Sequence, residues 1–365
     1  MITIVLGSVL GSVVLLLAAG LVYRAVRQYQ HARALALQTP RRIEEGRFVP
    51  VGDIDQWIQI RGEDRDNPVL LVLHGGPGLS YAPFTSTFRS WEPHFTVVHW
   101  DQRGAGKTSS RNNKEGSEPM TIDRMVQDGI EVTEFVLIHL NKSKLILFAH
   151  SWGTILGIQM LKRRPDLFSA YVGTGQIVDM ASSEVLSYDL ACEQIRAAGD
   201  TKALKALQAI GRPPYQDART WLMKQRFIMK IAPPPTSGRS LPNVFSSVLL
   251  SPGYSLKDAY ALVGGFMSSP VKLFQQVMSY DARQCGTTFE APIFLFQGDA
   301  DLQTPARAVE EYFATIQAPK KELLLLNNEG HIAVLISPDV FLHELLARVR
   351  PLVLEAEANT QSAQL

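Results

Sequence analysis

Short apolar segments recur along this chain, and they restrict its possible folds more than any other feature. A strand that is apolar on both faces is typical of a parallel sheet covered by helices on each side. Segments with apolar residues at helical spacing lie between them, over 121–140, 152–163 and 338–350. This alternation predicts an α/β fold with a mostly parallel, doubly wound sheet. The predicted strands are 56–60, 69–73, 96–100, 145–148, 293–296 and 323–326.

The alternation stops between residues 176 and 287, where the pattern is mostly helical. Because strand signals resume after this stretch, we expect it to be a helical insertion that covers the site as a lid. The predicted core of the sheet domain is therefore 50–175 together with 288–355. The polar residues 356–365 are predicted to be a disordered tail.

The N-terminal segment 2–23 contains no charged residue and is long enough to span a bilayer as a helix. No basic residue precedes it, whereas five arginines follow it within 24–42. A cleaved signal peptide has basic residues first, so we interpret 1–23 as a transmembrane anchor and 24–49 as a juxtamembrane spacer. A cleaved signal peptide and a buried core helix are the alternatives. The basic flank predicts a cytoplasmic catalytic domain under the positive-inside rule.

Composition agrees with a globular protein and disfavours some partners. Apolar residues make up 46% of the 365 residues, which suits a large core. The net charge of +1 gives no attraction toward nucleic acid. Cys192 and Cys285 match no metal-binding spacing and are expected to be free thiols, with a disulfide as the alternative. The sequence contains no phosphate-binding loop, haem-ligand set or zinc cluster, so no cofactor is expected, and the oligomeric state stays open.

Ser151 lies where the apolar segment 145–148 gives way to a helical pattern, in the sequence AHSWG. A nucleophile elbow needs small residues two positions before and after its serine, because the strand-to-helix turn is tight. Ala149 stands where glycine is usual, and its small side chain still satisfies this need. The segment therefore predicts a nucleophile, with a serine that merely caps a helix as the alternative.

A glycine-rich loop, HGGPG at 74–78, follows the segment 69–73. Acyl transfer needs two N–H donors directed at the developing oxyanion. When a serine stands at an elbow, one donor is the backbone N–H of the next residue, here Trp152. The other comes from the loop after an early strand, and Gly76 is the expected donor because Pro77 has no N–H.

Two more loops that follow apolar segments carry the other residues of a triad. Asp301 lies three residues after Gly298 and is the expected acid, with the nearby Asp299 as the alternative. His331 is the expected base, which takes the Ser151 proton and returns it to the leaving group. The chain order of serine, acid and histidine is that of α/β-hydrolases and differs from other serine-hydrolase folds.

Three motifs together resemble a known family: HGGPG at 74–78, DQRGAG at 101–106 and SWG at 151–153. Over about residues 50–350 the chain resembles the proline iminopeptidase branch of the α/β-hydrolases, peptidase family S33. The resemblance implies the α/β-hydrolase fold and places the family's triad on Ser151, Asp301 and His331. It also implies removal of an N-terminal residue from small peptides or amino-acid amides.

The lid departs from that family in the residues that would hold the substrate amine. Proline iminopeptidases supply carboxylates from Trp/Glu-rich lid segments, and this lid has no Trp-x-x-Trp-Glu sequence. Its only glutamates are Glu184 and Glu193, and its basic residues outnumber its acidic ones. A buried ammonium group without a carboxylate partner is costly. Glu184 and Glu193 are therefore candidate amine ligands, with an ordinary role on exposed helix faces as the alternative.

We therefore expect a serine hydrolase that acts through an acyl-enzyme intermediate. The first hypothesis is a proline-type aminopeptidase with a short-peptide or small-molecule substrate, held at the membrane through residues 2–23. The second is an esterase or amidase for small apolar substrates, because the lid is rich in apolar residues. The third is a non-enzymatic binding module, which a complete triad disfavours.

Overall fold

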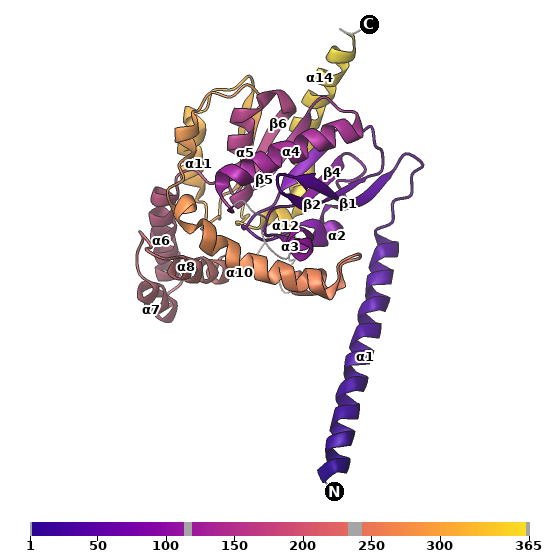
Figure 1. The fold of residues 1–365 in the computed structure, drawn as a ribbon. Coiled ribbons are helices and arrows are strands. Elements are labelled where there is room, and N and C mark those ends of the chain that lie inside the picture. The colour runs from indigo at the N-terminus through magenta and orange to yellow at the C-terminus, as the bar shows by residue number, and fades with distance from the viewer. Residues whose placement is uncertain (1, 113–118, 233–242, 363–365) are drawn as a thin grey trace.

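The computed structural model describes residues 2–112, 119–232 and 243–362, and an eight-stranded sheet forms its centre (Figure 1). The strand order is β1-β2-β4-β3-β5-β6-β7-β8. β2 pairs antiparallel with β1 and β4, and the other pairs are parallel, so the prediction of a mostly parallel sheet is confirmed. The strands are β1 (Ile43–Val51), β2 (Ile54–Gly62), β3 (Val69–Leu73), β4 (Thr96–Asp101), β5 (Leu145–His150), β6 (Phe168–Thr174), β7 (Ile293–Gly298) and β8 (Lys321–Leu326).

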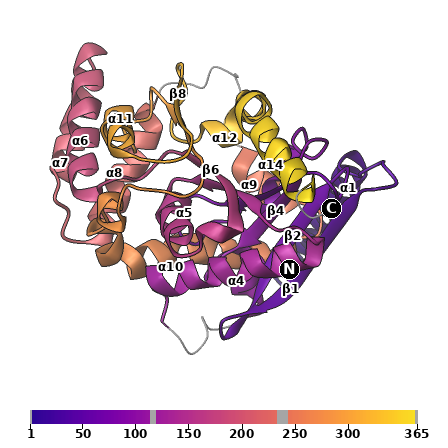
Figure 2. The same ribbon diagram turned by 90° about the horizontal axis from the view of Figure 1, so that it is seen from above.

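Helices cover both faces of the central strands, as the apolar segments predict (Figures 1 and 2). Leu71 and Leu73 of β3 belong to a core shared with α4 (Ile122–Leu140), α5 (Trp152–Arg163) and α11 (Ala306–Thr315). Leu70 and Val72 of the same strand belong to a second core, on the opposite face. That core includes residues of α13 (Pro338–Glu344), the π-helical turn η4 (Leu345–Val349) and α14 (Arg350–Ser362). Successive side chains of the strand point to opposite faces of the sheet, so β3 contributes to both hydrophobic layers.

Three parts of the sheet differ from the sequence expectation. β1 occupies the last seven residues of the expected spacer 24–49, so the sheet begins at Ile43 and not at residue 50. Only the ends and one further position of this edge strand are buried, which hides it from a search for apolar runs. β6 was also not predicted, because Ser169 and Gly173 interrupt its apolar pattern. β8 was expected to be buried on both faces, but it is an edge strand and Leu325 is 41% exposed.

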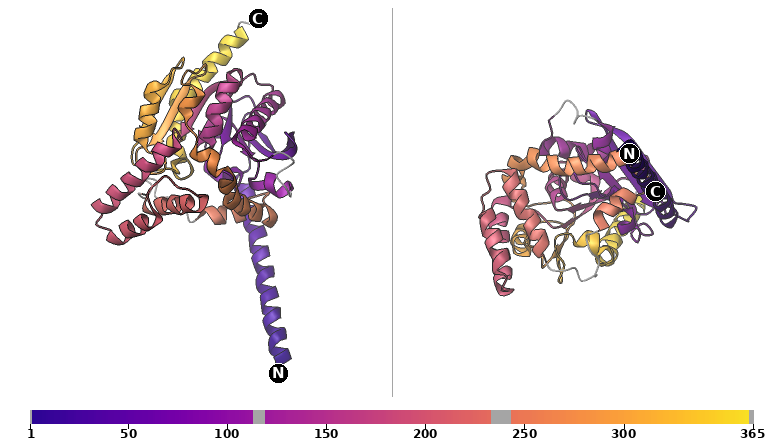
Figure 3. Two further views of the ribbon diagram at one scale, coloured as in Figure 1. Left: turned by 60° about the vertical axis from the view of Figure 1, so that its left-hand side comes forward. Right: turned by 90° about the horizontal axis from the view of Figure 1, so that it is seen from below.

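The lid region lies between β6 and β7 and is helical, as expected. Its described helices gather at the carboxyl edge of the sheet, on the side from which α1 projects (Figures 1 and 3). The chain after β8 differs from the prediction, since α14 continues through Ser362 where 356–365 was expected to be disordered. Residues 363–365 lie outside the described residues. The lid helices are α6 (Met180–Ala197), α7 (Thr201–Ile210), α8 (Ala218–Ile231), α9 (Asn243–Leu250) and α10 (Leu256–Met278).

Helix α1 (Ile2–Ala34) extends away from the domain (Figures 1 and 3). Among the described residues it is the one helix that is long and apolar enough to cross a membrane, over Leu10–Ala34. None of the most apolar part of that segment is buried in the protein, so the interpretation as a buried core helix is wrong. A membrane span and a signal sequence both remain compatible with these properties.

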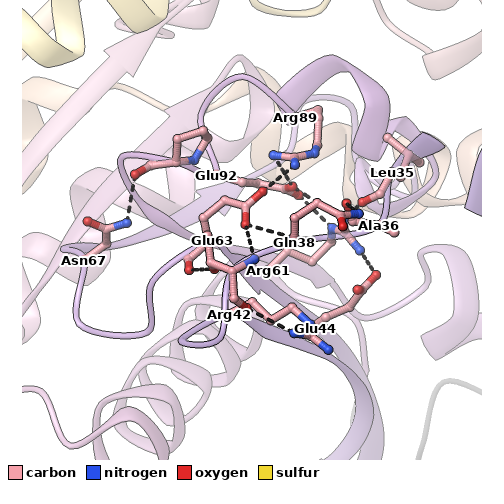
Figure 4. Close-up of polar contacts among 12 residues, drawn as sticks. Leu35, Ala36, Gln38, Arg42, Glu44, Arg61, Glu63, Asn67, Arg89 and Glu92 are labelled. Atoms are coloured by element: carbon pink, nitrogen blue, oxygen red, sulfur yellow. Dashed lines mark hydrogen bonds and ion pairs between the residues drawn. The ribbon is translucent and has the colours of Figure 1, made fainter. Parts of the chain in front are cut away.

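A buried cation joins the end of α1 to the sheet (Figure 4). The Arg61 guanidinium of β2 donates to the Glu92 carboxylate, with 2.7 Å between Nε and Oε1, and it also binds Glu44 of β1. It donates as well to the carbonyl oxygen of Leu35, directly after α1. Arg61 is 5% exposed and Glu92 is 1% exposed. Burial removes both charges from water, and the attraction between them offsets the free energy that this desolvation costs.

We predict that Glu92→Ala lowers the free energy of unfolding by about 3–5 kcal/mol, because it leaves the Arg61 charge buried without its main partner. Denaturant unfolding of the full chain in detergent measures the loss. Glu311→Ala is the control, since it removes an exposed pair with Arg307 on α11 and should cost no more than about 1 kcal/mol. Equal losses in the two variants would contradict the importance of the Arg61 site.

Candidate active site

Ser151 lies at the sharp turn between β5 and α5, in a backbone conformation that L-residues rarely adopt. Its φ is 52° and its ψ is −120°. The strand β5 is held between β3 and β6, and the Ser151 N–H donates to the carbonyl of Thr174 at the end of β6 (3.0 Å). A Cβ on Gly153 would lie 2.4 Å from the Leu73 carbonyl oxygen of β3. The turn therefore fits only while residue 153 lacks a side chain.

The structure brings the three expected triad residues together. His331 Nε2 lies 2.8 Å from Ser151 Oγ, and His331 Nδ1 lies 2.9 Å from Asp301 Oδ2. Ser151 follows β5, Asp301 follows β7 and His331 follows β8, so three parallel strands deliver them to one edge of the sheet. The alternative acid Asp299 points elsewhere, because it accepts the Asn328 N–H at 2.7 Å.

Asp301 is buried and fully engaged by donors. Besides His331, it accepts the backbone N–H groups of Gln303 and Thr304 at 2.8 and 2.9 Å and the Thr304 hydroxyl at 2.6 Å. Gln297 Nε2 of β7 adds a contact at 3.2 Å. Burial alone would raise the pKa of the Asp301 carboxyl, but the His331 charge and these hydrogen bonds hold that pKa below its ordinary value. The group is thus an ionised carboxylate that can orient an imidazole.

A cavity of about 210 Å³ opens at Ser151 and is hereafter called the Ser151 cavity. Gly76 and Trp152, the two expected oxyanion donors, line it together with Ser151 and His331. Gly76 has a φ of 65°, a left-handed backbone conformation that glycine adopts without steric strain. This conformation sets the direction of the loop after β3. Trp152 is the first residue of α5, where a helix leaves its N–H groups free of partners within the helix. Such an arrangement is able to bind a developing oxyanion beside an activated serine.

Comparison with known proteins identifies the fold family. The sequence model of the protein family described as alpha/beta hydrolase fold matches residues 68–338 of this chain. The chain belongs to the α/β-hydrolase family. It is 31% identical to a probable aminopeptidase, YbaC, of Bacillus subtilis strain 168, over 82% of this chain and 94% of that protein.

The resemblance to the proline iminopeptidase branch is also confirmed. A proline iminopeptidase of Lactobacillus delbrueckii subsp. lactis is 26% identical over 50% of this chain and 61% of its own length. A solved proline iminopeptidase of Mycobacterium smegmatis has a TM-score of 0.62 and 18% identity, covering 86% of this chain and 100% of that one. At that identity the solved structure supports the shared fold alone.

Within this hydrolase, His150 links two parts of the site. Its Nδ1 lies 2.5 Å from the Tyr81 hydroxyl, and its Nε2 lies 2.7 Å from the backbone oxygen of His331. Burial, together with the nearby His331 charge, lowers the pKa of His150 to about 3, so the ring is neutral. A neutral ring has one N–H, and the carbonyl of His331 can only accept it, so Nδ1 accepts from Tyr81. The residue before the nucleophile thus holds the backbone of the triad histidine.

The segment DQR at 101–103 has structural roles in this hydrolase. Asp101 accepts the Lys107 N–H at 2.7 Å and the Tyr254 hydroxyl at 3.0 Å, and burial raises its pKa to about 6. Gln102 accepts from the Trp152 indole N–H at 2.9 Å, which fixes the side chain of an expected oxyanion residue. Arg103 is buried and binds both Asp128 and Asp53. The resemblance located this segment, but the contacts of its side chains could not be read from spacing.

The lid is seated on the site by close backbone contact. A Cβ on Gly265 of α10 would lie 2.0 Å from the Gly104 carbonyl oxygen and 3.0 Å from that of Gly78. The helix α10 therefore crosses directly over the loop after β3 and the loop after β4. Nothing in the sequence pattern distinguished Gly265 from the adjacent Gly264, which has open space around it.

The two candidate amine ligands are placed in different surroundings. Glu184 of α6 is buried, and it is the one acidic residue of the described chain that lines the Ser151 cavity. Glu193 is exposed and lies by another hollow, beside Arg196 and Arg212. An amine-binding role for Glu193 at Ser151 therefore finds no geometric support.

Glu184 is engaged by three side chains of α8. It accepts from the Trp221 indole N–H at 3.0 Å, from Gln225 Nε2 at 2.6 Å and from the Lys224 ammonium at 2.8 Å. Lys224 has no exposed surface, so its charge offsets that of Glu184 inside the protein. Gln225 Oε1 is buried without a hydrogen-bond partner among the described residues, and Gln225 lines the Ser151 cavity. The uncommitted acceptor thus has no surface open to the cavity in this structure, and it lies next to a neutralised carboxylate.

The remaining sequence expectations concern cysteine and metals. Cys192 and Cys285 are both free, so they do not form the alternative disulfide. Among the residues that the structure describes, no group of three or more histidine, cysteine and acidic side chains could hold a metal ion.

We predict that Gly153→Ala destabilises the hydrolase by about 1–3 kcal/mol, because the added Cβ forces the Ser151 turn away from Leu73. Thermal or denaturant unfolding of the full chain measures this loss. Gly264→Ala is the matched control, since its Cβ meets no atom within 4 Å, and a helix gains up to about 1 kcal/mol from alanine in place of glycine. If both variants were equally stable, the close contact at Gly153 would not constrain the turn.

Proposed function

We propose that this hydrolase attacks acyl groups with Ser151 and forms an acyl-enzyme intermediate. The hydrogen-bonded series Ser151–His331–Asp301 is the observation that carries this proposal. His331 takes the Ser151 proton as the oxygen attacks the carbonyl carbon, and it later protonates the leaving group. Water, activated by the same histidine, then releases the acyl group. The Gly76 and Trp152 N–H groups are the proposed oxyanion donors.

We propose a proline-type aminopeptidase activity on small peptides or amino-acid amides as the first assignment. It is supported by the similarity to the probable aminopeptidase of Bacillus subtilis and by the acceptor groups in the cavity wall. In this proposal the Gln225 side chain turns so that its Oε1, together with Glu184, accepts hydrogen bonds from the substrate's free amine. A carboxylate has about four acceptor positions, so Glu184 retains capacity beside its present donors.

An esterase or amidase for small apolar substrates is the second assignment, and the Lys224–Glu184 pair favours it. Because Lys224 neutralises Glu184, the one carboxylate that lines the cavity among the described residues, the electrostatic attraction for an ammonium group is weakened. Apolar side chains such as Leu222, Phe266 and Val277 line much of the same cavity. An uncharged acyl group would fit such a surface.

We further propose that α1 is retained as a single-pass membrane anchor with the catalytic domain on the cytoplasmic side. The exposed apolar surface of α1 and the arginines that follow residue 23 support this arrangement. In sealed vesicles of known orientation, added protease should digest the domain only when the cytoplasmic face is outside.

We predict that a fluorophosphonate probe labels the full chain and fails to label Ser151→Ala. Asp301→Asn should retain the labelling site but lower kcat by about 10⁴-fold, because the imidazole loses the carboxylate that orients it and stabilises its charge. The labelled residue is identified by peptide mass spectrometry. Labelling of the Ser151→Ala variant by the probe would contradict the assignment of Ser151 as the nucleophile.

The substrate assignment is tested with proline 4-nitroanilide, its N-acetylated form and 4-nitrophenyl butyrate. For an aminopeptidase, we predict that Gln225→Met raises KM for the free-amine anilide about tenfold, which corresponds to one lost hydrogen bond of about 1.4 kcal/mol to a charged group. Butyrate ester hydrolysis should change little. Glu193→Gln is the control and should leave both activities unchanged, since Glu193 lies outside the cavity.

Turnover of the butyrate ester without turnover of the free-amine anilide would reject the aminopeptidase and favour the second assignment. The double variant Glu184→Gln with Lys224→Met removes both buried charges together, which avoids leaving Lys224 unpaired. An aminopeptidase should lose activity toward the free-amine anilide in this variant, whereas an esterase should retain activity toward the butyrate ester.

A further inference from the structure

One face of the lid helix α10 is apolar and exposed, although the opposite face is buried. Leu262, Ser269 and Leu273 pack inward, whereas Phe274, near the C-terminal end of the helix and in line with its exposed side, is also buried. Steps of four, three, four and four residues separate a second set of apolar residues, so they lie along one side of the helix. These residues are between 43% and 81% exposed, and they extend over about 22 Å at 1.5 Å per residue. They are Leu256, Tyr260, Val263, Met267 and Val271, hereafter the α10 stripe.

The α10 stripe reaches the mouth of the Ser151 cavity. Phe266, next to Met267, lines the cavity and is 42% exposed, as is Met229 of α8. Arg226 of α8 also lines the cavity, and its guanidinium contacts the Met267 sulfur at 3.3 Å. An extended apolar surface of this kind marks a place where another apolar phase or molecule binds. Its position means that the bound partner lies beside the entrance to the site.

Contacts of α1 fix the level of α10 relative to a membrane. The uncharged segment ends at residue 23, and Arg24 is the first charged residue after it. Arg24 Nε donates to the Leu249 carbonyl at 2.9 Å, and its guanidinium also binds the Tyr254 carbonyl. Gln28 Nε2 donates to Ser251 and Tyr254 at 2.7 and 2.9 Å. The chain directly before α10 is therefore bonded to the turn of α1 where a membrane span would meet the headgroups.

The arrangement of the helices agrees with this level. α10 and α8 lie on the side of the domain from which α1 projects, and α14 lies on the opposite side (Figures 1 and 3). Exposed basic residues, Lys257 on α10 and Lys230 on α8, accompany the apolar ones. Apolar side chains with flanking lysines are typical of helices that lie in the headgroup region of a bilayer with anionic lipids.

We propose that the α10 stripe rests in the surface of the lipid bilayer that α1 spans, and that this contact sets the mouth of the Ser151 cavity against the headgroups. The inference rests on the proposed anchor. The bilayer is favoured over a second copy of the chain because Arg24 and Gln28 bring the start of α10 to the end of the span.

Nitroxide quenching tests the contact in vesicles of phosphatidylcholine and phosphatidylglycerol. The full chain with Cys192→Ala and Cys285→Ala carries one new cysteine, labelled with an environment-sensitive fluorophore. Tyr260→Cys and Val263→Cys report the α10 stripe, and Leu15→Cys reports the anchor. Ile138→Cys is the matched control, because Ile138 is 82% exposed, like Tyr260 at 81%, but lies on α4. Thermal unfolding shows that each variant is folded.

We expect nitroxide-labelled lipid to quench fluorescence at positions 15, 260 and 263 and to leave position 138 nearly unchanged. If the label at position 15 is quenched, but the labels at 260 and 263 are quenched no more than the control at 138, the inference is overturned and the anchor stands. Absence of quenching at 15 would refute the anchor and the inference together. A third outcome is that the labels at 260 and 263 are not quenched but change their emission with protein concentration in detergent. This outcome would assign the stripe to a second copy of the chain and would also overturn the proposal.

Discussion

The strained turn at Ser151 is the constraint on which the rest of the site depends. A residue other than glycine at this φ costs of the order of 1–3 kcal/mol, and the surrounding structure has to hold it there. The central position of β5 between β3 and β6 supplies that restraint, together with the contact between Gly153 and the Leu73 carbonyl. Thr154 Oγ1 also donates to the Ser151 carbonyl at 2.7 Å. Strand pairing and helix packing thus maintain the orientation of a single hydroxyl.

The same turn also controls the histidine, through His150. Because His150 precedes Ser151 and bonds the His331 backbone oxygen, a shift of the elbow moves the Ser151 and His331 side chains together. Tyr81 fixes the other side of the ring, and Gly75 makes room for it, since a Cβ there would lie 2.4 Å from His150 Nδ1. The loop that supplies the proposed oxyanion donor is therefore packed against His150, the residue that holds the backbone of His331. Hydrogen-bonding groups that are preorganised in this way need no rearrangement at the moment of reaction.

Much of the site could be predicted from the sequence because it lies where parallel strands end. Ser151, Asp301 and His331 each follow a strand, and chain order alone separates this fold from other serine hydrolases. The sequence could not indicate that Lys224 pairs with Glu184, because residues forty positions apart on two lid helices meet only through tertiary packing. Edge strands were the least visible part of the sheet. β1 has exposed charged residues, so it does not form an apolar segment. The consecutive leucines of β8 are typical of an inner strand that is buried on both faces, whereas β8 lies at the edge of the sheet.

The short connection between α1 and β1 has a consequence for how the enzyme meets its substrates. Arg61 binds the carbonyl of Leu35, and Glu63 accepts the N–H groups of Gln38 and Thr39, so the residues between helix and sheet are not a free tether. A flexible linker would let a catalytic domain sweep through a wide volume above its anchor. Here the domain instead keeps one height and one tilt with respect to α1. If α1 spans the membrane, the enzyme works in a thin layer of fixed depth, and a scissile bond carried above or below that layer stays out of reach whatever its chemistry.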